Sequence, residues 1–142
     1  YKRQFEGGGM SFPSWDYYNS TAATQTIPIT GSNTFYDIKT VSSFVAATYQ
    51  FQFEAGSTNT FTNWNLNGSA TTPVQIRSSV AGTQASLSKS SGTVTVTYFD
   101  IKDSNATGGA VWNATSATNT NSGNNTGWSF PYTGTANFFM FM

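Results

Sequence analysis

The alternation of apolar and polar residues along this chain predicts a series of short β-strands. In the stretch 93–102, Val94 and Val96 alternate with threonines, which is the two-residue period of a strand with one buried face. The phase then changes, because Phe99 and Ile101 continue the alternation on the opposite parity. Such a change indicates a bulge or a corner between two faces. We expect a corner, with Phe99 buried and Asp100 facing outward.

Six further segments carry strand patterns bounded by turn residues. The clearest is 48–55, in which Tyr49, Phe51 and Phe53 alternate with polar residues. In the segment 24–30, Pro28 cannot donate to a ladder, which places it on an edge or at a strand end. No window has a helical period, so the sequence predicts an all-β fold. The other segments are 33–41, 59–68, 73–78 and 85–88.

A motif of an aromatic residue, Asp or Asn, and an apolar residue follows a glycine turn four times. The aromatic residues are separated by 21, 28 and 35 residues, within the range of about 20 to 50 that is typical of stacked repeats. We therefore expect a parallel β-helix-like solenoid, and an antiparallel β-sandwich or jelly roll is the alternative. The copies are Trp15-Asp16-Tyr17, Tyr36-Asp37-Ile38, Trp64-Asn65-Leu66 and Phe99-Asp100-Ile101.

If these copies stack, their middle residues form a ladder on the outer face. Asp37, Asn65 and Asp100 would then follow one another at the inter-strand spacing of about 4.8 Å. Lys39 and Lys102 lie two positions further along and are expected to neutralise the two acids.

The composition narrows the classes of function. The 142 residues include six Lys or Arg and six Asp or Glu, so the net charge is zero and nucleic acid is not an expected partner. The absence of Cys and His excludes disulfides, thiolate metal sites and imidazole-dependent triads. No apolar run approaches the roughly 18 residues of a membrane span. We expect a protein that is not an enzyme and holds no cofactor or metal.

Asp100 and Asp103 are the only acids close together in the sequence. A glycosidase needs two carboxylates roughly 5 to 10 Å apart, and with Asn105 the pair would offer oxygen ligands to calcium. The sequence Asp103-Ser104-Asn105 is more typical of a turn that bonds its own backbone. We therefore expect neither catalysis nor metal binding here. Exposed aromatic rings stack on sugars, and the candidate glycan contacts, with core or cap packing as the alternative, are Trp112, Trp128 and Tyr132.

We expect one domain with three parts: a lead-in and first partial rung at 1–30, a body at 31–112 and a C-terminal cap or docking tail at 113–142. The chain begins with Tyr1 and has no signal segment, so we expect a C-terminal piece of a longer protein. Exposing a large apolar side chain costs about 1.5 to 3 kcal/mol relative to burial. Five apolar residues at the end are therefore expected to plug the open end or to dock into a neighbouring subunit: Phe138, Phe139, Met140, Phe141 and Met142.

Two motifs in the second half resemble C-terminal β-solenoid segments of bacteriophage structural and tail-associated proteins. They are Ala-Thr-Gly-Gly-Ala at 106–110 with Trp112, and Gly-Asn-Asn-Thr-Gly-Trp at 123–128. The resemblance covers 31–130 and implies a structural or decoration domain of a virion, present in several copies, possible as a trimer, with other virion subunits as partners. The alternatives are a receptor- or glycan-binding tail fibre or tailspike module on a host surface glycan, and a location on a bacterial cell surface.

Overall fold

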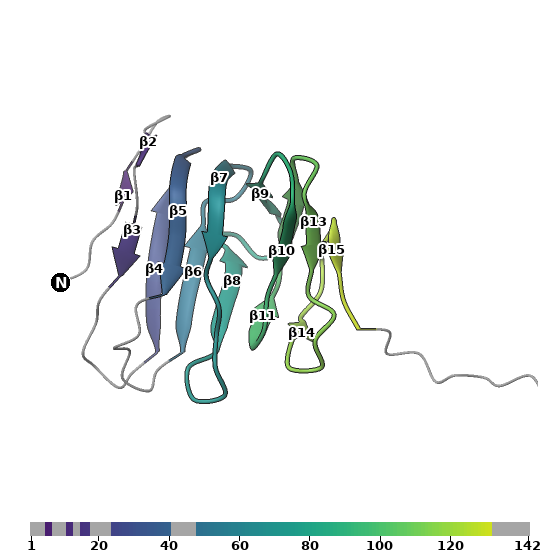
Figure 1. Ribbon diagram of the computed structural model, residues 1–142. Helices are drawn as coiled ribbons and strands as arrows, with labels where there is room; N and C mark the ends of the chain where they lie inside the picture. Colours follow the sequence, from purple (N-terminus) through teal and green to yellow (C-terminus); the bar gives the residue numbers. More distant parts are fainter. Residues whose placement is uncertain (1–4, 7–10, 13–14, 18–23, 41–47, 132–142) are drawn as a thin grey trace, which may run out of the picture.

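The computed structural model describes residues 24–40 and 48–131, together with the backbone of three short strands before them (Figure 1). This part of the chain is all-β, and every pairing between its strands is parallel. The expected all-β class is confirmed. The alternative of an antiparallel sandwich or jelly roll is wrong, because it requires neighbouring strands that run in opposite directions.

The strands form three parallel sheets. Sheet A contains β1 (Phe5–Glu6), β4 (Gln25–Thr30), β6 (Tyr49–Phe53), β8 (Val74–Ser78), β11 (Phe99–Ile101) and β14 (Thr120–Asn121), in that order. Sheet B contains β2 (Ser11–Phe12) and β3 (Trp15–Tyr17), both paired with β5 (Thr34–Thr40), and then β7 (Thr58–Asn65), β9 (Ala85–Ser88) and β12 (Ser104–Thr107). Sheet C contains β10 (Thr93–Thr95), β13 (Val111–Asn113) and β15 (Trp128–Ser129).

The chain visits these sheets in a regular order. Strands β4 to β7 alternate between sheets A and B, and from β8 onward the chain also enters sheet C. We call each return to sheet A a pass, so that five passes begin at β4, β6, β8, β11 and β14. Figure 1 shows that the strands advance steadily in one direction from β4 to β15. Successive passes therefore pair with each other through their strands in sheet A.

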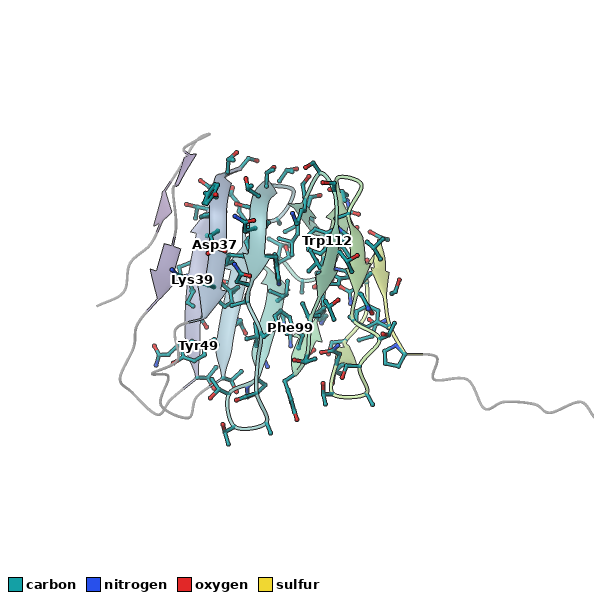
Figure 2. All side chains as sticks on the ribbon, in the orientation of Figure 1. Asp37, Lys39, Tyr49, Phe99 and Trp112 are labelled. Carbon is teal, nitrogen blue, oxygen red and sulfur yellow. The ribbon has the colours of Figure 1, made fainter. Side chains whose placement is uncertain are left out.

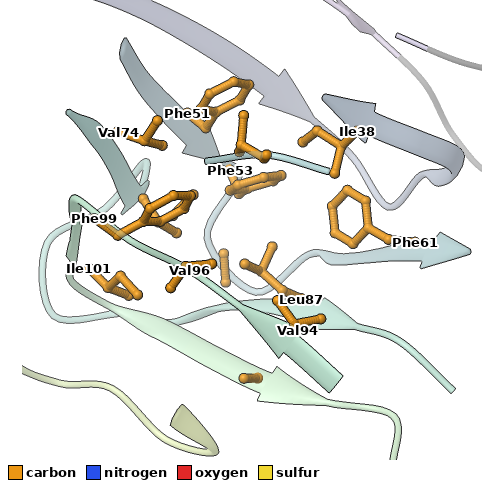
Figure 3. Packing of buried hydrophobic residues seen from close by; sticks show 14 of the residues in the cluster. Ile38, Phe51, Phe53, Phe61, Val74, Leu87, Val94, Val96, Phe99 and Ile101 are labelled. Carbon is orange, nitrogen blue, oxygen red and sulfur yellow. The ribbon is translucent and has the colours of Figure 1, made fainter. Parts of the chain in front are cut away.

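Inward-facing side chains stack in columns between the sheets. In sheet A, Phe51 pairs with Ile76 and Ile76 with Ile101, and all three are buried. Figure 3 shows Phe51 and Ile101 in one cluster with side chains from sheet B, such as Phe61 and Leu87. Burial of each such side chain contributes about 1.5 to 3 kcal/mol. The alternation predicted for 48–55 is confirmed by this packing.

The predicted corner in 93–102 is present. Strand β10 ends at Thr95 in sheet C, and β11 begins at Phe99 in sheet A. Between them Tyr98 has a φ of 57°, in the left-handed region where non-glycine residues are uncommon. Val96 and Phe99 are both buried, so the side-chain alternation restarts across the turn. Asp100 faces outward, as expected.

The predicted ladder of Asp37, Asn65 and Asp100 is wrong. Asp37 and Asn65 belong to β5 and β7 of sheet B, whereas Asp100 belongs to β11 of sheet A. Within sheet B the register pairs Asp37 with Asn63 and Lys39 with Asn65. The three-residue motifs therefore do not occupy equivalent positions in successive passes.

A bend in β5 explains why Tyr36, the aromatic residue of the second motif, faces outward, whereas the motif predicts that it faces the core. Phe35 and Ile38 are both buried although they are three residues apart, and Tyr36 between them is 58% exposed. Strand β7 bends at the paired position, since Phe61 is buried, Thr62 is exposed and the next residue packed against the core is Trp64. Two consecutive residues face outward at each bend, which shifts the alternation by one.

Pro28 lies inside β4 rather than at its end. It pairs with Gln52 of β6 on one side. On the other side, the described pairing of β4 with β1 begins only at Ile29. Pro28 therefore occupies a position where, over the residues that the structure describes, β4 has a partner on one side only, which is the edge environment that proline tolerates.

Candidate functional site

Residues of the preceding and the following pass bond to the carboxylate of Asp100. Arg77 of β8 forms an ion pair with Oδ2 and also donates from Nη1 to the backbone carbonyl of Asp100 at 2.7 Å. Ser122 donates its hydroxyl to Oδ1. The expected partners, Lys39 and Lys102, were therefore wrong, because the register places Arg77 diagonally beside Asp100. Because both carboxylate oxygens of Asp100 are bonded, the side chain connects its own pass to the passes on either side.

Asp103 occupies the corner between sheets A and B and is only 3% exposed. Asn124 of the next pass donates Nδ2 to Oδ1 at 2.7 Å, and the backbone N–H of Gly82 in the preceding pass also donates to the side chain. The bond from Asn124, assisted by the one from Gly82, lowers the pKa of Asp103 below its ordinary value of 3.8 despite the opposing effect of burial. The ionised side chain thus connects three successive passes.

The same corner contains a column of residues with left-handed backbone conformation. Their φ angles lie between 53° and 84°, a region that glycine enters freely and Asn and Asp enter more readily than other residues. The chain can therefore turn from sheet A into sheet B at the same place in every pass. The members of the column are Gly31, Gly56, Gly82, Asp103 and Asn124.

The acids of the described residues do not form a cluster that could hold a metal ion. Across 24–40 and 48–131, no group of three or more Asp or Glu side chains lies close enough to hold a metal ion. Asn105, the third candidate calcium ligand, donates Nδ2 to Ser86 Oγ at 3.2 Å and accepts from Thr126 at 2.7 Å. The polar atoms of this turn are used to connect passes.

The candidate glycan contacts Trp112 and Trp128 lie in a column of packed indoles. Trp112 is 2% exposed, and its Nε1 donates to the carbonyl of Thr107 at 3.0 Å. Its ring centroid lies 5.5 Å from that of Trp64 and 4.9 Å from that of Trp128. Trp128 is half-buried and donates Nε1 to Ser104 Oγ at 3.0 Å. The ring of Trp112 therefore has no open face for a sugar in this structure.

The remaining candidates cannot be placed. Tyr132 and the predicted cap or docking residues lie outside the described residues. The latter are Phe138, Phe139, Met140, Phe141 and Met142.

The glycines of the two resemblance motifs bring neighbouring passes close together. A Cβ at Gly108 would lie 2.6 Å from the carbonyl oxygen of Lys89, and one at Gly127 would lie 2.0 Å from the carbonyl oxygen of Ala106. Both positions also have positive φ angles, of 92° and 74°. These motifs thus specify close backbone contact between passes, which only glycine permits.

The bends in β5 and β7 create a polar patch that the sequence analysis missed. We call it the Tyr36 patch, and it consists of Tyr36, Asp37, Thr62, Asn63 and Asn65. Tyr36 is 58% exposed, and Asn65 donates Nδ2 to Asp37 Oδ1 at 2.8 Å. Figure 2 shows Asp37 and Lys39 on β5, well separated from Trp112. The available signal was the three-residue spacing of Phe35 and Ile38, which turns two consecutive residues outward.

A column of hydroxyl groups runs beside this patch on the outer face of sheet B. The register pairs Thr34 with Thr60, Thr60 with Ser88 and Ser88 with Thr107. Thr107 donates to the carbonyl of Leu87 at 3.3 Å. In the described part of the chain, the side-chain hydroxyls of Thr34, Thr60 and Ser88 make no hydrogen bond to protein. Thr34 is exposed and Thr60 and Ser88 are half-buried, so these hydroxyls are able to bond solvent or a ligand.

No helix within 24–40 and 48–131 is long and apolar enough to cross a membrane. Comparisons of the chain with models of known protein families, with curated proteins and with solved structures found no match.

Proposed function

We propose that the five passes form a parallel β-helix-like solenoid, and that this solenoid is a non-enzymatic structural or decoration domain of a bacteriophage particle. The observation that carries the proposal is the continuity of bonding from pass to pass. Asp103 connects three passes, and the Arg77–Asp100 ion pair and the Asn33–Asn59 side-chain bond of 3.0 Å each connect two. A domain bonded in this way is suited to act as a rigid part of a larger assembly.

The packing of the interior supports the solenoid. Phe35 stacks on Phe61 of the next pass with ring centroids 5.3 Å apart, and Phe53 of sheet A meets Phe61 of sheet B edge to face at 6.4 Å. One apolar core is thus shared by successive passes and by opposite sheets. Each pass buries its apolar face only by stacking on its neighbours, which is the organisation of a repeat protein.

On this proposal the partners are other virion subunits and further copies of the chain, with a trimer as one possible assembly. The apolar residues Phe138, Phe139, Met140, Phe141 and Met142 either cap the end of the stack or dock into a neighbouring subunit. Deleting 138–142 distinguishes the two roles. Loss of a cap lowers the stability of the isolated domain, whereas loss of a docking segment lowers the oligomeric state in sedimentation experiments and leaves stability unchanged.

Antibody labelling of purified phage particles tests the location. An antibody raised against 24–131 is applied to particles of the source phage after gradient purification, and bound antibody is located by electron microscopy. We expect labelling at fixed, repeated positions on each particle. Gradient fractions in which the chain separates from intact particles would contradict a virion role.

The second candidate function is a receptor- or glycan-binding module of a tail fibre or tailspike, and the exposed Tyr36 ring favours it. An aromatic ring that is 58% exposed beside a carboxylate and amides is a common arrangement at polar binding surfaces. The two functions are compatible, since a structural solenoid can present a binding site on its outer face.

A further inference from the structure

We propose that the Tyr36 patch, with the hydroxyl column beside it, binds an extended, neutral polysaccharide chain. The inference rests on the second candidate function and gives it a site and a ligand class. It differs from the glycan contacts expected at Trp112 and Trp128, whose rings pack between passes. The site lies on the outer face of sheet B, on strands β5, β7 and β9.

The aromatic part of the site is available because of the bend in β5. Phe35 and Ile38 both point into the core, so Tyr36 and Asp37 are neighbours on the outer side. The paired bend in β7 places Thr62 and Asn63 next to them, since Phe35 pairs with Phe61 and Asp37 with Asn63. A phenol ring offers a flat apolar surface to the C–H face of a pyranose, and its hydroxyl bonds at the edge.

The polar part of the site matches the hydrogen-bonding groups of a sugar. A sugar hydroxyl both donates and accepts, and carboxylate oxygens accept while amide groups do both. Asp37 is held in place by Asn65 through Oδ1, which leaves Oδ2 without a partner among the described residues. Asn63 and Asn65 supply the amides. Each of these side chains is therefore able to bond a ligand hydroxyl.

The repeat of the sheet favours an extended chain over a single sugar. The hydroxyls of Thr34, Thr60 and Ser88 follow one another at the inter-strand spacing of about 4.8 Å. This spacing is close to the length of one pyranose unit in an extended polysaccharide. A chain that crosses the strands of sheet B would thus meet one open hydroxyl per strand beyond the Tyr36 ring.

The charge distribution favours a neutral ligand. Charges of both signs lie at the patch: Asp37 carries a carboxylate, Lys89 donates Nζ to the carbonyl of Thr62 at 2.5 Å, and Lys39 lies beside Asn65. An anionic polysaccharide would be repelled by the carboxylate, and a cationic one would be repelled by the ammonium groups. A neutral ligand avoids both kinds of repulsion.

Affinity electrophoresis of the whole chain tests the proposal. The protein is run in native gels that contain neutral polysaccharides, such as dextran, mannan or galactomannan, and in gels that contain anionic alginate. We expect retardation by at least one neutral polymer. Tyr36→Ala should weaken this retardation roughly tenfold, about 1.4 kcal/mol, through loss of the ring, and Tyr36→Phe should largely preserve it. The matched control is Val111→Ala, because Val111 of sheet C is also 58% exposed and should leave retardation unchanged.

Three results would overturn the site: no retardation by any neutral polymer, retardation by alginate alone, or equal retardation of the wild type and Tyr36→Ala. Circular dichroism of each variant excludes misfolding as the cause of a loss. Thr60→Val, which removes one open hydroxyl and keeps the β-branched shape, should also weaken binding. Antibody labelling of particles is independent of these gels, so failure of the site and failure of the virion role are distinguishable.

Discussion

Two glycines at the same corner allow the contact between passes to be measured separately from backbone strain. Gly92 and Gly108 both lie in the turn from sheet B to sheet C, with φ angles of 83° and 92°. A Cβ added at Gly92 would meet no atom within 4 Å, whereas one at Gly108 would lie 2.6 Å from the carbonyl oxygen and 2.7 Å from the nitrogen of Lys89. Replacement of each by alanine therefore imposes similar strain but a different contact.

The expected loss of stability follows from these distances. An L-residue in the left-handed region costs about 1 to 2 kcal/mol, and this applies to both variants. At Gly108 the clash with Lys89 adds about 1 to 3 kcal/mol of overpacking. It also strains two backbone hydrogen bonds of Lys89, from its N–H to Thr107 at 3.2 Å and from Ala110 to its carbonyl at 3.0 Å. We expect Gly108→Ala to be less stable than Gly92→Ala by about 2 kcal/mol.

Urea unfolding followed by tryptophan fluorescence measures this difference. With a slope near 2 kcal/mol per molar, the unfolding midpoint of Gly108→Ala should lie about 1 M below that of Gly92→Ala. Hydrogen exchange should also show faster exchange of the Lys89 and Ala110 amides in Gly108→Ala. Equal midpoints for the two variants would refute the reasoning, because the backbones of the third and fourth passes would then not be in contact at Gly108.

Three further substitutions address the core, the charged corner and the buried amide. Phe61→Ala removes a buried ring that contacts three other aromatic residues and should lower the free energy of unfolding in urea by about 3 to 5 kcal/mol. The exposed control Val111→Ala should lower it by less than about 0.5 kcal/mol. A similar loss in both variants would contradict the core assignment. The pKa of Asp103 is lowered in the folded state, so its carboxylate stabilises the protein fully above the ordinary pKa and loses this effect as the pH falls through the folded-state pKa. Asp103→Asn should therefore destabilise the protein at neutral pH and reduce the loss of stability below about pH 4. An unchanged dependence of stability on pH would count against this role. Asn119→Ala leaves the N–H of Phe99 and the carbonyl of Val96 without their buried partner and should cost about 2 to 4 kcal/mol, and a loss below 1 kcal/mol would argue that water replaces the amide.

The strands could be predicted from the sequence because their pattern is local. The segment 85–88 coincides with β9, and the segments 48–55 and 73–78 contain β6 and β8 within their bounds. The corner in 93–102 was also predictable, since two buried parities cannot share one straight strand. These features depend only on which residues face inward, which two-residue alternation reports directly.

The partners of each strand could not be predicted, because inward alternation is the same in all three sheets. Asp37 and Asp100 carry the same short motif but lie in different sheets, and the distinction depends on how many strands the intervening chain contains. The neutralising residue for Asp100 was missed for the same reason, since Arg77 becomes its neighbour only through the pairing of β8 with β11. Long-range register is set by the whole stack and leaves no local signature.

The bends in β5 and β7 relate the core to the candidate binding surface. A straight strand that buried Phe35 would also direct Asp37 inward, where an unpaired carboxylate is costly. Shifting the alternation by one residue buries Ile38 instead and turns Tyr36 and Asp37 outward together. The register repeats the same shift in the next pass, at Thr62 and Asn63. The requirement to bury an apolar residue on either side of the bend therefore places adjacent polar residues from two strands on one exposed surface, the surface at which we propose that a sugar chain binds.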